Sequence, residues 1–155
     1  MQKITPFLWF DHEAEEAAHF YTSVFKNSKM GSTMRYDANA AKASGMPEGS
    51  VLTASFELEG VQFTALNGGP VMKFSGAVSF VVSCETQDEI DYYWSKLSEG
   101  GEEGQCGWIN RDKFGLTWQI VPSNLPELIS TPAGMQAMLS MKKFDIAALR
   151  AANGS

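Results

Sequence analysis

The chain has 155 residues, 44% of them hydrophobic and 19% charged, which excludes a disordered chain and fits one globular domain with a buried core. Its net charge of −6 argues against a nucleic-acid-binding surface, which would need a basic stripe. No apolar run approaches the roughly 20 residues of a membrane span, and the first residues lack the apolar centre of a signal peptide.

The first half of the chain predicts one helix and four strands. Residues 12–26 have helical spacing of apolar side chains, with Asp11 as the expected N-cap and one stripe turned inward. Glu59-Gly60 is typical of a hairpin turn, and residues 37–50 are expected to form a long loop. The expected strands are Ile4–Phe10, Met30–Tyr36, Val51–Leu58 and Val61–Leu66. The inward stripe comprises Ala14, Ala17, Ala18, Tyr21, Val24 and Phe25.

The second half repeats this order. Ala77–Cys84 is a strongly apolar strand that we expect to be buried on both faces. A helix at Gln87–Glu99 turns Ile90, Tyr93, Trp94 and Leu97 inward and ends at Gly100-Gly101. Two strands, Cys106–Ile109 and Leu116–Val121, then flank a turn at Arg111–Gly115. Short helices follow at Leu125–Ser130 and Pro132–Met141, with Thr131 and Asp145 as expected caps for the second of these and for a last helix.

An internal repeat relates the two halves. Gly60–Leu66 aligns with Gly115–Val121, each segment having a glycine, an apolar residue, a polar one, an aromatic, a polar one and two apolar residues. The sequence therefore predicts an α+β fold of paired β-α-β-β-β modules with a helical tail. We expect one domain over residues 1–155, with modules at 1–70 and 71–122 and the tail at 123–155.

Several motifs resemble those of a known family. They are Leu8-Trp9-Phe10-Asp11, Phe20-Tyr21 with Val24-Phe25, Ser79-Phe80-Val81-Val82, Lys113-Phe114-Gly115 with Trp118-Gln119-Ile120-Val121-Pro122, and Met141-Lys142-Lys143-Phe144-Asp145. With the repeat, they resemble the vicinal oxygen chelate superfamily, the group of glyoxalases, bleomycin-resistance proteins and extradiol dioxygenases. The similarity is greatest to its PhnB-like branch, often labelled 3-demethylubiquinone-9 3-methyltransferase-like. The resemblance implies sheets curled into cups and a homodimer.

The resemblance also implies four strand positions where metal-using members place their ligands. Carried onto this chain, they fall approximately on Pro6, Thr64, Ser79 and Gln119. Proline offers no ligand atom, and neutral hydroxyls are poor ligands for a divalent transition metal. We therefore expect no catalytic metal and no cofactor.

Candidate ligand-binding residues follow from the alternation of the two hairpins. Gln119 and Thr64 occupy matching places and would face the cup if Trp118 and Phe63 face the helices. They would then be polar anchors in an apolar cavity, the alternative being ladder residues that bond to neighbours. The predicted set adds Ser79, Trp108 as the first choice among the tryptophans, and Arg35, which falls on a strand. Arg111 is interpreted as an exposed arginine of the hairpin and Asp112 as a turn former.

Histidines and cysteines are few. His12 and His19 lie two helical turns apart, about 10 Å, too far to share one metal, so we expect them to face solvent or the helix end. Cys84 and Cys106 are too few for a disulfide scaffold, which favours reduced, buried, inert thiols and a cytoplasmic protein.

Three functions are compatible with these features. The first is a metal-independent protein or enzyme that binds a small molecule in an apolar cup. The alternatives are a metal-dependent glyoxalase- or dioxygenase-type enzyme and a resistance protein that sequesters a drug. Whether any reaction is catalysed stays open. Methyl transfer is not expected, since no Gly-x-Gly-x-Gly turn follows a strand to hold S-adenosylmethionine.

Overall fold

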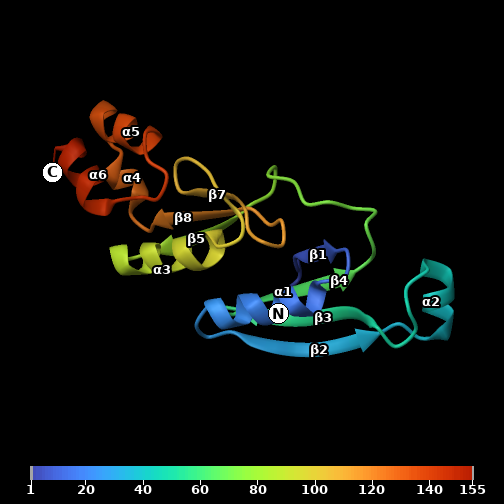
Figure 1. Cartoon of the computed structure of the whole chain (residues 1–155). Coiled ribbons are helices and arrows are strands. Elements are labelled where there is room, and N and C mark those ends of the chain that lie inside the picture. Colours follow the sequence, from blue (N-terminus) through green and yellow to red (C-terminus); the bar gives the residue numbers. More distant parts are fainter. Residues whose placement is uncertain (1, 155) are drawn as a thin grey trace. The chain divides into compact units, whose positions relative to one another are not determined.

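The computed structural model describes residues 2–154. The chain divides into two compact units, Met1–Phe74 and Ser75–Ser155, and each is described by itself. In both units a mixed four-stranded sheet carries a helix on one face (Figure 1). The predicted α+β class, with two β-α-β-β-β modules and a helical tail, is confirmed. The predicted single domain with module boundaries at residues 70 and 122 stays a prediction.

The first unit is built around the sheet β1-β4-β3-β2. Strand β1 runs parallel to β4, and the other neighbours are antiparallel. Glu59 and Gly60 both adopt positive φ, 48° and 82°, as the tight turn between β3 and β4 requires. The elements are β1 (Phe7–Phe10), α1 (Ala14–Val24), β2 (Lys29–Arg35), α2 (Ala38–Ser44), β3 (Val51–Leu58) and β4 (Val61–Asn67).

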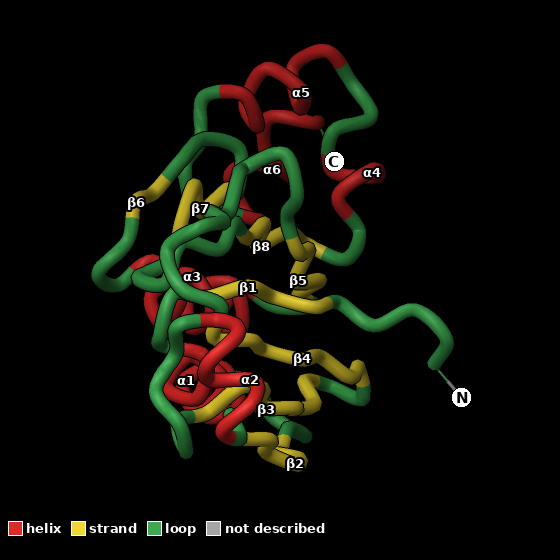
Figure 2. The backbone as a smooth tube through the Cα atoms, turned by 90° about the vertical axis from the view of Figure 1, so that its right-hand side faces the viewer, coloured by secondary structure: helices red, strands yellow, loops and turns green. Residues whose placement is uncertain are grey.

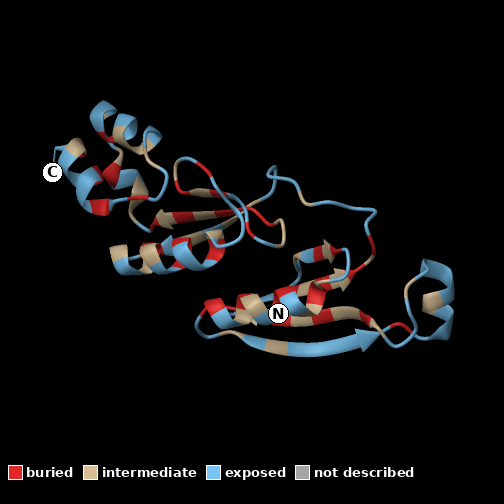
Figure 3. Ribbon diagram, in the orientation of Figure 1, coloured by how far each residue is buried: buried red, intermediate tan, exposed pale blue. Residues whose placement is uncertain are grey.

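Helix α1 packs on one face of this sheet through the predicted stripe, all of which is buried. Three alanines in the stripe are fully buried, and their small side chains let the helix lie close to β3 and β4. Tyr21 stacks on Phe56 with ring centroids 6.2 Å apart, and Phe56 stacks on Phe63 at 5.3 Å. Figure 3 shows this core as buried positions along α1, β3 and β4, whereas β2 is almost entirely exposed.

The prediction that Asp11 caps α1 is wrong. The N-cap residue is Glu13, whose side chain makes no capping bond. Instead, Asn67 at the end of β4 accepts a hydrogen bond from Ala14 N through Oδ1 at 2.8 Å. The cap therefore comes from the neighbouring strand, which the local sequence does not reveal.

The predicted loop at residues 37–50 is also wrong, because it contains helix α2. Asp37 caps that helix by accepting from Ala40 N at 2.7 Å, and Gly45 ends it in the left-handed conformation at φ 79°. No residue of α2 is buried, so the segment has no inward apolar stripe by which its helix could be predicted.

The second unit repeats the arrangement with the sheet β5-β8-β7-β6. Strand β5 runs parallel to β8, and β8, β7 and β6 pair antiparallel. Figure 2 labels these four strands. The elements are β5 (Phe80–Cys84), α3 (Gln87–Ser98), β6 (Glu102–Glu103), β7 (Trp108–Arg111), β8 (Trp118–Pro122), α4 (Leu125–Leu128), α5 (Pro132–Leu139) and α6 (Ile146–Asn153).

The expectation that the strand of residues 77–84 is buried on both faces is wrong. Val81 is 56% exposed and Val78 is 68% exposed, whereas Cys84 is fully buried. The helix α3 contacts the sheet on one side only, through the four predicted residues Ile90, Tyr93, Trp94 and Leu97. An unbroken apolar run is typical of two-sided burial, but here one side is left open.

The helical tail packs within the second unit. Cys106 N donates to Met141 O and Gly107 N to Lys142 O, both at 2.8 Å. Phe144 is 1% exposed, and Gln87 at the start of α3 donates to its carbonyl oxygen at 2.9 Å. The predicted caps Thr131 and Asp145 are confirmed, since each accepts from a backbone N–H of its helix.

Candidate functional site

Alternation along the central strands gives each sheet one buried face and one open face. Phe63 on β4 and Trp118 on β8 are 7% and 3% exposed and lie on the helix-covered face. Thr64 and Gln119, the next residues, lie on the opposite face and are half-buried. The open faces are where side chains can meet a ligand.

In the second unit, four side chains gather on this open face. Trp108 on β7 and Val81 on β5 are the register partners of Gln119, one on each side of it. Register partners point to the same face of a sheet. Gln119 Nε2 donates a hydrogen bond to Ser79 Oγ at 2.9 Å. We call Ser79, Val81, Trp108 and Gln119 the Trp108 row.

The first unit has a corresponding row with different chemistry. Phe7 on β1 and Ser55 on β3 are the register partners of Thr64. Ser55, in the place of Trp108, accepts from Ser32 N at 2.8 Å and donates to Ser32 O at 3.1 Å. These bonds hold the bulge in the edge strand β2. At this position the first unit therefore has a structural serine instead of an aromatic ring.

Arg35 lies apart from Thr64 in the first unit. It is the last residue of β2 and pairs in register with Val51, whereas Thr64 lies opposite Ser55 further along the sheet. Its Nη1 donates to Gly49 O at 3.0 Å, at the base of the segment that carries α2. The structure therefore brings together three of the predicted site residues, Gln119, Ser79 and Trp108, but not Thr64 with Arg35.

The four tryptophans differ in what their indole N–H groups contact. Three of them donate within the fold. Over residues 2–154 the indole N–H of Trp108 has no such acceptor, and its side chain is half-buried. Trp108 is thus the tryptophan that can donate to a bound molecule. The other acceptors are Gly69 O for Trp9 (2.9 Å), Glu103 Oε2 for Trp94 (2.9 Å) and Asp112 Oδ2 for Trp118 (2.8 Å).

The positions implied for metal ligands do not have suitable donors. Divalent transition metals prefer imidazole, thiolate and carboxylate ligands, and Pro6, Thr64, Ser79 and Gln119 supply none of these. Pro6 contributes only a carbonyl oxygen, which accepts from Thr64 N at 3.0 Å. Within the described part of the chain, no three His, Cys, Asp or Glu side chains are grouped closely enough to hold a metal ion. The residues therefore do not fit a catalytic metal.

The histidines have the predicted surroundings. His12 is 79% exposed, and its Nδ1 lies 3.2 Å from Glu13 Oε2 and 3.7 Å from Asp11 Oδ1, next to the start of α1. His19 is exposed on the same helix. The prediction of solvent-facing and helix-end roles is confirmed.

The two thiols differ more than predicted. Cys84 is fully buried, and its burial, together with the negative charge of Glu89, raises the pKa of the thiol to about 12. Cys106 is only half-buried, so the prediction of burial is wrong for it. It adopts a left-handed backbone at φ 57° in the turn before β7, and its Sγ lies 3.6 Å from Met138 O.

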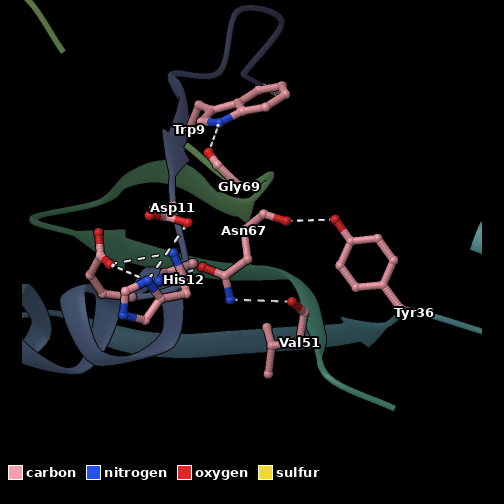
Figure 4. A network of polar contacts seen from close by, with 9 residues as sticks. Trp9, Asp11, His12, Tyr36, Val51, Asn67 and Gly69 are labelled. Atoms are coloured by element: carbon pink, nitrogen blue, oxygen red, sulfur yellow. Dashed lines mark hydrogen bonds and ion pairs between the residues drawn. The ribbon is translucent and has the colours of Figure 1, made fainter. Parts of the chain in front are cut away.

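A polar network around Asn67 was not predicted (Figure 4). Besides capping α1, Asn67 donates through Nδ2 to Val51 O at 3.2 Å and accepts from Tyr36 OH at its carbonyl oxygen at 2.5 Å. Asn67 is 7% exposed, so these bonds satisfy a buried amide. Its position before Gly68-Gly69 is typical of a loop, and nothing in the local sequence indicates the buried network.

The turn between β7 and β8 contains a buried carboxylate, that of Asp112. The sequence predicts Asp112 as a turn former but does not predict its burial. Asp112 is 2% exposed, and its Oδ1 accepts from Phe114 N at 2.8 Å and Leu116 N at 3.0 Å. Its Oδ2 accepts from the indole of Trp118. Arg111 is 65% exposed and lies 3.6 Å from Glu102, as predicted for a surface arginine.

Comparisons with known proteins relate the chain to others of this fold. No described helix is both long and apolar enough to span a membrane. No curated protein matches the chain in sequence. A crystal structure from Pseudomonas aeruginosa shares the fold at 18% identity, with a TM-score of 0.60 and coverage of 77% of this chain and 96% of the other. A glyoxalase/bleomycin resistance protein/dioxygenase domain from Frankia superposes with a TM-score of 0.48 at 13% identity, over 80% of this chain and 95% of the other.

Two further matches are specific. A PhnB protein from Bacillus cereus is 38% identical, with a TM-score of 0.69 and coverage of 78% of this chain and 99% of the other. The family model described as 3-demethylubiquinone-9 3-methyltransferase matches residues 2–121, which include both modules. The chain therefore belongs to this family, and the predicted similarity to PhnB-like proteins is confirmed.

Proposed function

We propose that the protein binds a small molecule without a metal, on the open face of the second sheet at the Trp108 row. The observation that carries the proposal is the indole N–H of Trp108, which has no acceptor in the described chain and lies beside Gln119 in register. An aromatic side chain with one open polar group is typical of a ligand platform.

The amide of Gln119 supports the same site. Its bond to Ser79 Oγ fixes the orientation of the amide and leaves the carbonyl oxygen Oε1 for a ligand. Val81 lies on the other side of Gln119 and is 56% exposed, which adds apolar surface. A polar anchor between an aromatic and an aliphatic side chain matches the composition of small-molecule sites.

Thr64 has the corresponding place in the first unit, and we propose that it belongs to a separate, weaker binding surface of that unit. Its register partner Phe7 is 59% exposed, which offers an apolar surface beside a hydroxyl group. Arg35 contributes less to the proposal, because its guanidinium group bonds to Gly49 at the end of β2.

Binding without chemistry is favoured over catalysis. The Trp108 row contains a serine, a valine, a tryptophan and a glutamine, none of which titrates near neutral pH. A general acid or base needs a titrating group within hydrogen-bond reach of the substrate. This observation favours a protein that sequesters its ligand. A glyoxalase- or dioxygenase-type enzyme would also need metal ligands, and the four corresponding positions do not supply them.

Methyl transfer, which the printed description of the family names, is not supported by the strand-to-helix turns. A nucleotide-fold methyltransferase holds S-adenosylmethionine at a glycine-rich turn between a parallel strand and a helix. The two corresponding turns here are Asp11-His12-Glu13 and Glu85-Thr86, and neither contains glycine. We therefore expect S-adenosylmethionine to leave the melting temperature unchanged.

We also propose a homodimer in the cytoplasm. Large apolar side chains outside the proposed ligand contacts are exposed in both units, including Met34 and Val78, and a second copy would cover such surface. Neither cysteine forms a disulfide, which suits a reducing compartment.

The test is a thermal-shift screen of aromatic compounds, followed by calorimetric titration of the hits. Trp108→Leu and Gln119→Leu are expected to weaken the binding of a hit at least about fivefold each, the loss of one hydrogen bond or ring contact. Tyr92→Leu is the matched control, since Tyr92 is an exposed aromatic on α3, which covers the other face. Hits whose affinity does not change in the two row variants would contradict the proposed site.

A further inference from the structure

We infer that the ligand of the Trp108 row is an uncharged, planar compound at least two fused rings wide, with a carbonyl or hydroxyl oxygen along one edge. This inference rests on the proposed function and narrows it to a class of ligand.

The three strands that form the Trp108 row, β5, β8 and β7, have no charged side chain on the open face. Its outward positions are the alternate residues of β5, β7 and β8, together with Ser79, and all of them are neutral. A charged group placed there would lose water without finding a counter-charge, which is strongly unfavourable. The outward positions are Ser79, Val81, Ser83, Trp108, Asn110, Gln119 and Val121.

The nearest charges on neighbouring strands already have partners. Glu102 Oε1 lies 3.6 Å from Arg111 Nη2, and its Oε2 accepts from Asn110 Nδ2 at 3.1 Å. These groups neutralise one another at the edge formed by β6 and β7. An anionic ligand at Gln119 would therefore have no cationic side chain of this sheet to pair with, and a cationic ligand would have no anionic one.

The hydrogen-bonding groups of the Trp108 row favour a ligand with a neutral oxygen. The indole N–H of Trp108 is a donor, and Gln119 Oε1 is an acceptor. Because Ser79 Oγ accepts from Gln119, its own proton can be donated elsewhere. Two donors and one acceptor around Gln119 suit a ligand that carries a neutral oxygen able to accept, or a hydroxyl group able to do both.

The width of the Trp108 row favours a ligand with fused rings. Trp108, Gln119 and Val81 lie on three adjacent strands, so the row spans two strand spacings of roughly 4.8 Å, about 9.6 Å in all. A fused two-ring compound can cover the indole and the valine while its oxygen reaches the amide between them. A single ring leaves one of these apolar side chains uncovered.

The test compares three probes of one shape, namely 2-naphthol, 2-naphthoate and 2-naphthylmethylammonium, by calorimetric titration of the full chain at pH 7. The neutral probe is expected to bind at least about tenfold more tightly than either charged one. Trp108→Leu is expected to weaken the binding of 2-naphthol at least about fivefold, and Tyr92→Leu is expected to leave the affinity for 2-naphthol unchanged.

A second variant tests the charge argument directly. Gln119→Glu keeps the shape of the side chain and adds a negative charge to the row, so it is expected to make the cationic probe the tightest of the three. A charged probe that binds wild-type protein as tightly as 2-naphthol, and loses affinity in Trp108→Leu, would overturn the inference while leaving the site in place. If no probe binds in a way that depends on Trp108, both the inferred class of ligand and the proposed ligand site would be overturned.

Discussion

At the scale of single residues, the indole N–H of Trp108 can be tested without any ligand. Three indole protons are donated to acceptors of the fold, whereas that of Trp108 has no acceptor among the residues that the structure describes. Exchange with solvent deuterium requires a hydrogen bond to open, so Trp108 is expected to exchange fastest of the four. Two-dimensional proton–nitrogen spectra after transfer to D₂O measure this, with Trp108→Phe assigning the signal. If the indole proton of Trp108 exchanged as slowly as that of Trp118, the claim that the Trp108 N–H is available to a ligand would be wrong.

Asp112 is expected to stabilise the turn between β7 and β8. Replacing it with alanine leaves three donors without their acceptor, namely Phe114 N, Leu116 N and the indole of Trp118, at a buried position. We expect a loss of roughly 2–4 kcal/mol in the free energy of unfolding. Urea denaturation measures the change, and the exposed Asp88→Ala is the control, expected to change it by less than about 0.5 kcal/mol. Equal stability of the two variants would contradict this role.

The two thiols are expected to differ in reactivity. The pKa of Cys84 is raised to about 12 by burial, so the thiol stays protonated and inaccessible at pH 8, whereas Cys106 is half-buried. Iodoacetamide at pH 8 is expected to modify Cys106 first, and mass spectrometry locates the adduct. Both sites should react in 8 M urea, which serves as the control. Modification of Cys84 ahead of Cys106 in the folded protein would contradict this reading.

The raised pKa of Cys84 also predicts a dependence of stability on pH. The folded state holds the proton more tightly than the unfolded state, whose thiol has the ordinary pKa of 9.0. The free energy of unfolding is therefore independent of this group below about pH 8 and falls as the pH rises from about 9 towards 12. Denaturation of wild type and Cys84→Ala across this range measures the difference, which should shrink as the pH rises. A constant difference would rule out the thiol as its source.

At the scale of elements, the packing of the C-terminal tail is expected to require glycine at position 107. A Cβ added there would lie 2.5 Å from the ring of Phe144, and the backbone has φ 80°. Gly107→Ala should therefore displace the segment Met141–Asp145 and increase its proteolysis. Gly45→Ala is a matched control, because Gly45 has φ 79° and no atom within 4 Å of an added Cβ. If the tail of Gly107→Ala resisted proteolysis as well as the tail of Gly45→Ala, the close approach of the added Cβ to Phe144 would not disturb the tail, which would contradict this prediction.

Elements with an inward apolar pattern could be predicted from the sequence, and those without one could not. The stripes of α1 and α3 and the alternation of β3, β4 and β8 all reflect burial on one face. Helix α2 buries no residue and is held by its Asp37 and Gly45 caps, so the sequence pattern predicts a loop there instead of a helix. The exposure of Val81 was missed because an apolar run does not tell which of its faces a helix covers.

The candidate site was predictable to the same extent. Alternation places Gln119 and Thr64 on the open faces, and parallel pairing of β5 with β8 brings Ser79 to Gln119. The position of Arg35 depends on bulges in β2, which shift its register. The cap that Asn67 gives to α1 joins residues 53 positions apart, a distance over which no local pattern is informative.

At the scale of the whole molecule, the exposed apolar surface predicts self-association. Met34, Val61 and Val71 in the first unit and Val78 in the second are each more than 40% exposed and lie outside the proposed ligand contacts. Sedimentation equilibrium at micromolar concentration is expected to give twice the chain mass of 17.0 kDa. Met34→Asp and Val78→Asp should shift the protein towards single chains, with the exposed Lys96→Asp as control. A wild-type protein that sediments as one chain would contradict the proposed dimer.

The most direct test of the account is whether a ligand reaches Trp108. The four indole signals of nitrogen-15-labelled protein are followed while 2-naphthol is added. If the ligand binds at the Trp108 row, the Trp108 signal is expected to shift until it saturates. The other three indole signals are expected to move far less, because the indoles of Trp9, Trp94 and Trp118 bond within the fold. A Trp108 signal that stays in place while 2-naphthol binds elsewhere would contradict a ligand site at the Trp108 row.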